Sequence, residues 1–164
     1  MLHPNTRRCT SPPIDASVRA VLFDRDGTLI TDVPYNGDPN LVAPIPGVKA
    51  ALDALRARGI SLAVVTNQSG VARGYITRED VDAVNARVES LLGPFAGFFV
   101  CPHGPDDGCR CRKPMPGLLL DAAAALGVKP SDCYVIGDKA SDIAAATAAG
   151  MRSTLVDPTH PLSP

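Results

Sequence analysis

Two aspartates, with one residue between them, follow an apolar segment. The run 21–23 leads directly into Asp24, and Asp26 precedes a Gly-Thr turn. Two carboxylates this close repel each other, so one must hold a proton unless a positive charge neutralises them. If the extended backbone continues past Phe23, Asp24 and Asp26 point the same way, because side chains alternate along a strand. The pattern predicts a divalent cation at the carboxyl end of a strand, where open α/β sheets bind ligands.

Three further groups of polar side chains occur near the ends of apolar runs: Thr66 with Asn67, Asp138 with Lys139, and Lys113 in a loop rich in Cys, His and Arg. In a parallel sheet these groups gather along one edge. Carboxylates supply the hard oxygen ligands that Mg²⁺ requires, while hydroxyl, amide and ammonium groups donate hydrogen bonds to phosphate oxygens. The combination suits phosphoryl transfer on a small phosphorylated metabolite.

Taken singly, these residues also have purely structural explanations. Asp26 before a glycine fits turn chemistry, and Thr66 fits a cap. Asp142 fits the first turn of a helix as well as a supporting role beside a metal, and Lys139 fits a solvated loop as well as a substrate contact. Asp24 differs from the others, because an acid that closes an apolar strand is costly to bury without a partner.

A second group of chemical side chains lies between residues 101 and 111. Three thiols and one imidazole satisfy tetrahedral zinc, and four protein ligands leave no open position for catalysis, so the predicted zinc is structural. The ligands are Cys101, His103, Cys109 and Cys111. A redox pair at Cys109 and Cys111, or chance clustering, are the alternatives. Bound zinc would order the loop that presents Arg112 and Lys113.

Composition restricts the class of protein. The chain has 164 residues, of which 45% are hydrophobic and 20% charged, as expected for one globular domain. Its net charge of −1 provides no field to hold nucleic acid or an anionic membrane. An odd number of cysteines, five, indicates a reducing compartment, and no segment is typical of a signal peptide or membrane span, so we expect a cytoplasmic protein. We expect a flexible tail over residues 1–17 and a single domain over residues 18–164.

Strand-like and helical segments alternate along the chain. Helical periodicity occurs over about 48–55, 77–91, 117–126 and 142–149, and apolar runs typical of strands cover 21–23, 61–65, 97–100, 133–136 and 152–156. This alternation predicts a mostly parallel, doubly wound α/β sheet with right-handed crossovers. No insertion after the first or second strand is long enough for a separate cap domain, so we expect a minimal cap and a zinc-binding loop.

Over residues 19–157 the chain resembles the haloacid dehalogenase-like phosphatases, through the DxDGT motif at 24–28, Thr66, Lys113 and the GDxxxD motif at 137–142. The resemblance implies the Rossmann-like fold of that superfamily. It also implies that Asp24 is the nucleophile that forms an aspartyl-phosphate and that Asp26 is the general acid and then the base. Mg²⁺ would bind between Asp24, the main-chain carbonyl of Asp26 and Asp138, with Asp142 in support. Thr66 and Lys113 would hold the phosphate oxygens.

The Cys/His loop and the Asn-Gln-Ser-Gly segment at 67–70 make the chain similar to one family within this superfamily. That family comprises the D-glycero-D-manno-heptose 1,7-bisphosphate 7-phosphatases and the related histidinol-phosphate phosphatases. The similarity implies a phosphomonoesterase whose substrate contacts are Asp32, Tyr35, Asn67, Gln68, Ser69, Arg112 and Lys139. We also expect a monomer. The segment 33–39 departs from the heptose pattern. Hydrolysis of histidinol phosphate or of another small sugar phosphate is the alternative reaction, and a phospho-ligand-binding regulator is the alternative from another class.

Overall fold

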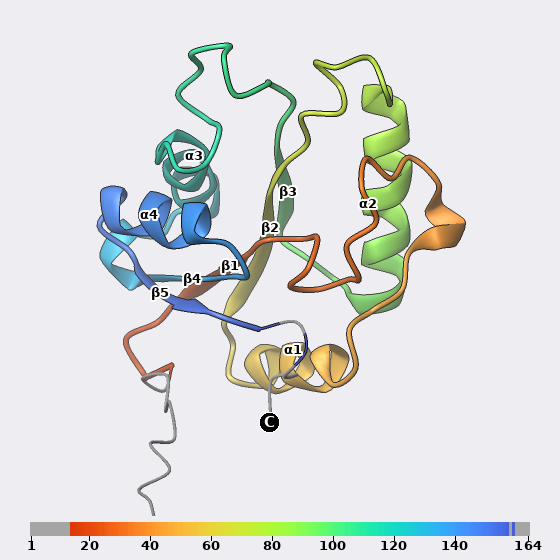
Figure 1. The fold of residues 1–164 in the computed structure, drawn as a ribbon. Coiled ribbons are helices and arrows are strands. Elements are labelled where there is room, and N and C mark those ends of the chain that lie inside the picture. The colour runs from red at the N-terminus through yellow and green to blue at the C-terminus, as the bar shows by residue number, and fades with distance from the viewer. Residues whose placement is uncertain (1–13, 158, 160–164) are drawn as a thin grey trace, which may run out of the picture.

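The computed structural model describes residues 14–157 and 159. Five parallel strands form one sheet in the order β3-β2-β1-β4-β5 (Figure 1). The strands are β1 (Ala20–Phe23), β2 (Ser61–Asn67), β3 (Gly97–Cys101), β4 (Cys133–Gly137) and β5 (Arg152–Leu155). The predicted parallel α/β architecture is confirmed. Each strand lies within two residues of its predicted bounds, and β2 runs on through Thr66 to Asn67.

Helices cover both faces of the sheet. They are α1 (Val48–Ala57), α2 (Arg78–Leu92), α3 (Gly117–Leu126) and α4 (Ala140–Ala148), with short 3₁₀ turns η1 (Pro39–Leu41) and η2 (Pro130–Asp132). Helix α1 and α2 lie on one face, and α3 and α4 lie on the other (Figure 1). Helix α4 begins two residues before the predicted start at Asp142, because Asp142 is in its first turn and accepts a hydrogen bond from the main chain of Lys139.

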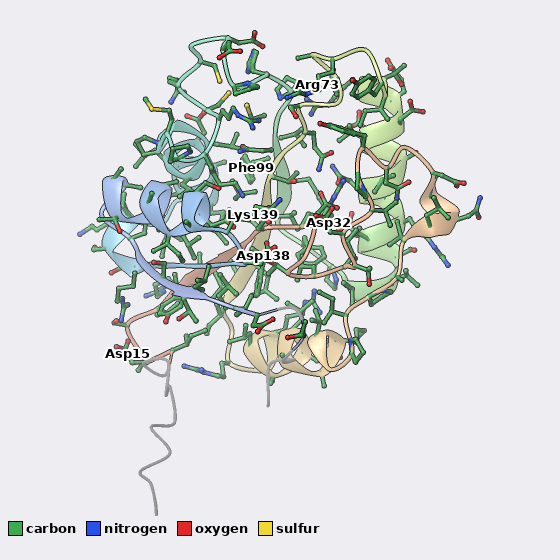
Figure 2. The ribbon with its side chains drawn as sticks, in the orientation of Figure 1. Asp15, Asp32, Arg73, Phe99, Asp138 and Lys139 are labelled. Atoms are coloured by element: carbon green, nitrogen blue, oxygen red, sulfur yellow. The ribbon has the colours of Figure 1, made fainter. Side chains whose placement is uncertain are left out.

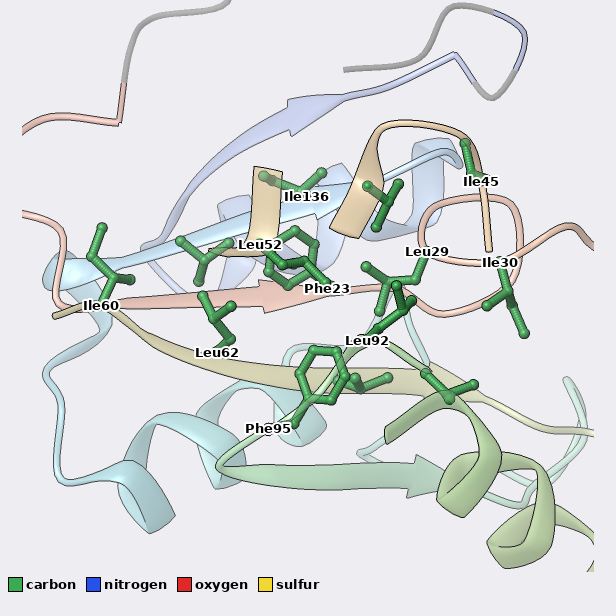
Figure 3. Close-up of a cluster of buried hydrophobic side chains, with 14 of the residues drawn as sticks. Phe23, Leu29, Ile30, Ile45, Leu52, Ile60, Leu62, Leu92, Phe95 and Ile136 are labelled. Carbon is green, nitrogen blue, oxygen red and sulfur yellow. The ribbon is translucent and has the colours of Figure 1, made fainter. Parts of the chain in front are cut away.

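Alternate residues of the central strand enter two hydrophobic cores. Val21 and Phe23 pack with α1 and α2, whereas Ala20 and Leu22 pack with α3 and α4. Figure 3 shows the first of these cores, with Phe23 in its centre. Phe23 is level with Val64 of β2 and with Ile136 of β4. Strands β1 and β4 therefore end at nearly the same level while β2 extends three residues beyond β1, and the residues that follow the strands meet at one edge.

The amino-terminal segment is described from Ile14 onward. Residues 1–13, and with them most of the predicted flexible tail, lie outside the described residues. Arg152 of β5 donates to Asp15 at 2.8 Å and to Ser17 at 2.8 Å, and Arg58 donates to the carbonyl of Ile14 at 2.6 Å. Residues 14–17 are thus tied to the sheet edge and to the end of α1.

Candidate active site

Three carboxylates meet beyond the ends of β1 and β4. Asp24 follows β1, Asp138 follows β4 and Asp142 lies in the first turn of α4, and one oxygen from each lies within 4.8 Å of the others. The Nζ of Lys113 is 3.0 Å from Oδ1 of Asp24 and 2.7 Å from Oδ1 of Asp142. It also donates to the carbonyl of Val65 at 2.7 Å. We call Asp24, Asp138 and Asp142 the carboxylate cluster.

The carboxylate cluster carries more negative charge than its surroundings balance. Burial, and then the hydrogen bond and charge of Asp24, raise the pKa of Asp138 to about 6. Burial also raises the pKa of Asp142, against the opposing charge of Lys113. Burial alone would lower the pKa of Lys113, but the charges of Asp24 and Asp142 outweigh it and raise the pKa. One ammonium group for three carboxylates leaves a donor set that fits a divalent cation bound through oxygen, such as Mg²⁺.

Two glycines make room for this cluster. A Cβ on Gly137 would lie 2.3 Å from Oδ2 of Asp142, and a Cβ on Gly27 would lie 2.3 Å from Oδ2 of Asp138. Gly27 also has φ of +80°, which disfavours any side chain. The hydroxyl of Thr28 donates to Asp138 at 3.1 Å. The DxDGT and GDxxxD motifs therefore need their glycines because backbone and carboxylate come unusually close.

The carboxylate of Asp26 lies outside the carboxylate cluster. Strand β1 ends at Phe23, so the extended geometry that would point Asp24 and Asp26 the same way does not continue. Asp26 instead accepts hydrogen bonds from Nε and Nη2 of Arg25, both at 3.2 Å, and from the amide of Gln68 at 2.8 Å. The expectation that both side chains face one cation is not met, and the charge that neutralises Asp26 is a guanidinium.

Arg25 and Asn85 were not singled out from the sequence. Arg25 is only 1% exposed, and its Nη1 donates to Oδ1 of Asn85 at 2.8 Å. An arginine between two aspartates looks like part of a solvated charged turn, which explains the omission. A signal was present in the helix: Asn85 is a polar residue within the buried stripe of α2 that also holds Val81, Val84 and Val88.

The polar residues at the end of β2 connect separate segments of the site. The side chain of Asn67 pairs with the main chain of Lys113, donating at 3.0 Å and accepting at 3.1 Å. The amide of Gln68 donates to the hydroxyl of Thr66 at 2.9 Å as well as to Asp26. Asn67 thus holds the segment that carries Lys113, and Gln68 links Thr66 to Asp26. Ser69 follows them at the edge of the adjoining cavity.

A cavity of about 580 Å³ opens over the strand ends. Asp24, Asp26 and Lys113 line its inner part. All seven predicted substrate contacts also line it, namely Asp32, Tyr35, Asn67, Gln68, Ser69, Arg112 and Lys139. Asp32, Asp138 and Lys139 lie together in the middle of the view in Figure 2. The structure therefore brings these predicted contacts together, whatever role each one has, whereas Asp138 and Thr66 are not among the residues that line the cavity.

Two loops form the mouth of this cavity in place of a cap domain. Tyr35, with φ of +52°, belongs to the loop between β1 and α1, and Tyr75 belongs to the loop between β2 and α2. Their rings pack edge to face at 4.9 Å, and the guanidinium of Arg73 lies 5.9 Å from the ring of Tyr35. These contacts join the loops on one side of the mouth.

The Cys/His group forms a second potential metal site. One ligand atom each from Cys101, His103, Cys109 and Cys111 lies within 4.8 Å of the others, and the three cysteines are free. The sulfur–sulfur separation between Cys101 and Cys109, 3.8 Å, matches the roughly 3.8 Å that tetrahedral zinc–thiolate geometry gives, whereas the separation between Cys101 and Cys111, 3.2 Å, is shorter. The carbonyl of His103 accepts a hydrogen bond from Arg112 at 3.2 Å, which connects this group to the cavity.

Comparison with known proteins supplies the family. The family described as haloacid dehalogenase-like hydrolase matches residues 35–150. The chain belongs to this family. A D-glycero-beta-D-manno-heptose-1,7-bisphosphate 7-phosphatase of Pseudomonas aeruginosa is 40% identical over 83% of the chain and 79% of its own length. The enzyme of the same name from Escherichia coli strain K12 is 36% identical over 90% and 84%, respectively.

Solved structures of this hydrolase family agree with the fold. The D,D-heptose 1,7-bisphosphate phosphatase of B. bronchiseptica, complexed with magnesium and phosphate, superposes with a TM-score of 0.79 and 34% identity over 84% of this chain and 80% of its own. A HAD-like phosphatase of Mesorhizobium loti gives 0.75 and 36% identity over 82% and 69%. The predicted family, the fold and a hydrolase activity are confirmed, and the named relatives support a phosphatase. Within the described part of the chain, no helix has both the length and the apolar character needed to cross a membrane.

Proposed function

We propose that this hydrolase is a Mg²⁺-dependent phosphatase that removes the 7-phosphate of D-glycero-D-manno-heptose 1,7-bisphosphate. The observation that carries the chemistry is the meeting of Asp24, Asp138 and Asp142, of which Asp24 and Asp142 pair with Lys113 and line the cavity. The sugar is inferred from relatives that bear this name and align with 83% and 90% of the chain. We expect the enzyme to act as a monomer in the cytoplasm.

The reaction divides into two displacements at phosphorus. In the first, an oxygen of Asp24 forms a bond to phosphorus while the bond to the sugar oxygen breaks, and Asp26 gives its proton to that leaving oxygen. In the second, Asp26 takes a proton from water as the water oxygen bonds to phosphorus. The bond between phosphorus and Asp24 then breaks, which releases inorganic phosphate and restores both carboxyl groups.

The other residues hold the phosphate and balance its charge. Lys113, within hydrogen-bond distance of Asp24, and Thr66 would donate to the phosphate oxygens beside the nucleophile. Asp24, Asp138 and the main-chain carbonyl of Asp26 would hold Mg²⁺, which would supply positive charge to offset that of the phosphoryl group. Asp142 supports this arrangement by its ion pair with Lys113.

The substrate's second phosphate fits the cationic part of the cavity. Arg112 and Lys139 line the cavity, and they would provide two charges for a group that a monophosphate lacks. Asp32 and Ser69 offer an acceptor and a hydroxyl for sugar hydroxyl groups, with Tyr35 at the mouth. A bisphosphate therefore uses more of this lining than a monophosphate does.

We also propose that Cys101, His103, Cys109 and Cys111 bind one structural zinc ion. Their four ligand atoms lie within 4.8 Å of one another, and a closed set of four ligands leaves no position for substrate. The chemistry of this donor set also suits zinc, because thiolates and imidazole are softer than the carboxylates of the active site. The zinc would hold Arg112 in place through the carbonyl of His103.

The main competing reaction is hydrolysis of histidinol phosphate, because the carboxylate of Asp32 in the cavity could also receive an amine. Initial rates for heptose bisphosphate and histidinol phosphate, measured with Mg²⁺ and compared as kcat/KM, decide between them. We expect the heptose bisphosphate to be preferred by at least tenfold, roughly what one well-made contact contributes. A preference of that size for histidinol phosphate would refute the sugar assignment.

A non-catalytic regulator is the alternative from another class. The Asp24→Asn variant separates it from an enzyme, because an amide cannot form the aspartyl-phosphate. We expect this variant to bind heptose bisphosphate with no detectable phosphate release, while the wild-type chain releases phosphate. A wild-type chain that binds the sugar phosphate without releasing phosphate would favour the regulator.

A further inference from the structure

We infer that Arg25, anchored by Asn85 of α2, is a positioning residue that holds the carboxyl group of Asp26 in place for proton transfer. This inference rests on the proposed function, in which Asp26 protonates the leaving oxygen. The contacts that carry it form a continuous series from the buried face of a helix to the active-site cavity. Asn85 contacts Arg25, Arg25 contacts Asp26, and Asp26 lines the cavity beside Asp24.

The guanidinium of Arg25 donates a hydrogen bond from each of its three nitrogens. Its Nε and Nη2 donate to the two different oxygens of Asp26, both at 3.2 Å, and its Nη1 donates to Asn85 at 2.8 Å. A fork of this kind fixes the plane of the carboxyl group as well as its position. Gln68 adds a donor at 2.8 Å to Oδ2. Asp26 is therefore held from the protein side, while 18% of its side chain remains accessible.

Burial of the Arg25 guanidinium carries a desolvation cost that its contribution to stability does not explain. Its side chain is 1% exposed, and the desolvation of a buried ion pair often cancels its Coulombic gain. Replacement of such a pair by apolar residues of similar size is commonly neutral for stability. Stability alone is therefore a weak reason for a charged residue at this position. Its contact with Asp26 provides a stronger one.

Proton transfer depends strongly on position. A general acid must lie within hydrogen-bond reach of the leaving oxygen, and a misplacement of about 1 Å can cost about 10²-fold in rate. Asp26 follows the end of β1, so its backbone alone does not give it the rigidity of a strand. Helix α2 supplies a rigid support for Asp26 through Asn85 and Arg25, because Val84 and Val88 beside Asn85 are fully buried in the core.

The test uses two substrates that differ in their need for a proton. In a sugar phosphate the leaving group is a sugar alkoxide, a poor leaving group that needs general acid catalysis. In p-nitrophenyl phosphate the leaving group is a stabilised phenolate, which does not need it. Because kcat/KM reports the steps up to release of the leaving group, it isolates the first displacement. The variant is R25M/N85L, which removes both polar partners and leaves apolar side chains of similar size.

We expect kcat/KM for the sugar phosphate to fall by about 10²-fold in R25M/N85L, at the low end of what general acid catalysis contributes. For p-nitrophenyl phosphate, kcat/KM should be almost unchanged. R25K, which keeps the charge but loses the fork, should show the same pattern to a smaller degree. The inference is overturned if R25M/N85L loses activity on both substrates equally, or on neither.

Two controls keep the outcomes distinct. D26N should show the same substrate-dependent loss, and an equal loss on both substrates in D26N would contradict the proposed role of Asp26 itself. V88A removes buried volume from the same face of α2 without touching Asp26. It should lower the thermal unfolding midpoint and leave the ratio of the two kcat/KM values unchanged. If V88A changes that ratio as R25M/N85L does, loosening of α2 is sufficient and the specific contact of Arg25 is not needed.

Discussion

At the scale of single residues, Lys113 decides whether the buried carboxylates can coexist. It is 4% exposed and contacts Asp24 and Asp142, so its ammonium group is the counter-charge for both. Removing one member of a buried ion pair leaves the other charge uncompensated, which costs more than the pair contributed. Lys113 therefore serves the folded state before any substrate arrives.

We expect Lys113→Met to lower the free energy of unfolding of the metal-free protein by about 3 kcal/mol, the low end of the cost of breaking a buried pair. Adding Asp142→Asn should recover part of this loss, because it removes one of the two uncompensated charges. Urea denaturation in the presence of a chelator measures both variants, with Asp142→Asn alone as the control. Strictly additive effects would show that Lys113 and Asp142 are not coupled.

At the scale of elements, the loop from β3 to α3 carries two anchors with separate effects. The main chain of Lys113 is held by Asn67 of β2, whereas Arg112 is held through His103 of the Cys/His group. Loss of zinc should therefore loosen Arg112 more than Lys113. Because Arg112 is the proposed contact to the second phosphate, binding should be affected more than the chemical step.

We expect the purified chain to contain about one zinc ion, and Cys109→Ser to lose it, since a structural site needs four ligands. The variant should raise KM for the bisphosphate more than it lowers kcat. Cys133→Ala is the matched control, because Cys133 lies in β4 outside the cluster. Elemental analysis and steady-state kinetics test both points. Zinc content that is unaffected by Cys109→Ser would remove Cys109 from the ligand set.

At the scale of the whole molecule, the proposed magnesium site can form only in the folded chain. Its carboxylates follow β1 and β4, which are adjacent in the sheet although more than a hundred residues separate Asp24 from Asp138 in sequence. An ion that binds the folded state alone stabilises it by mass action. We therefore expect magnesium binding and folding stability to be linked in this protein.

We expect Mg²⁺ at a hundred times its dissociation constant to stabilise the protein by about 2.7 kcal/mol and to raise Tm accordingly. Asp138→Asn should abolish this increase, whereas Asp82→Asn, which changes an exposed acid of α2, should retain it. Thermal scans with and without Mg²⁺ make the comparison. An increase in Asp138→Asn equal to that of the wild type would place the stabilising ion elsewhere.

Much of the fold could be predicted from local pattern. The apolar run 61–65 and the helical stripe that includes Val84 and Val88 placed β2 and α2 closely, because periodicity of burial is a property of neighbouring residues. The predicted ends of the helices and strands were less accurate than their positions. Helix α4 starts earlier than predicted because Asp142 caps it from within, and β1 ends before Asp24 because the chain turns there.

The sequence by itself determined which residues bear the chemistry and that strand ends would gather them, since residue types and alternation are local facts. Only the tertiary structure decided how they pair. In the folded chain Lys113 lies between Asp24 and Asp142. The side chain of Asn67 is hydrogen-bonded to the main chain of Lys113, and Asp26 is paired with Arg25. These pairings depend on strand order and on the end of β1, and no spacing along the chain encodes the distance between segments that meet only after folding.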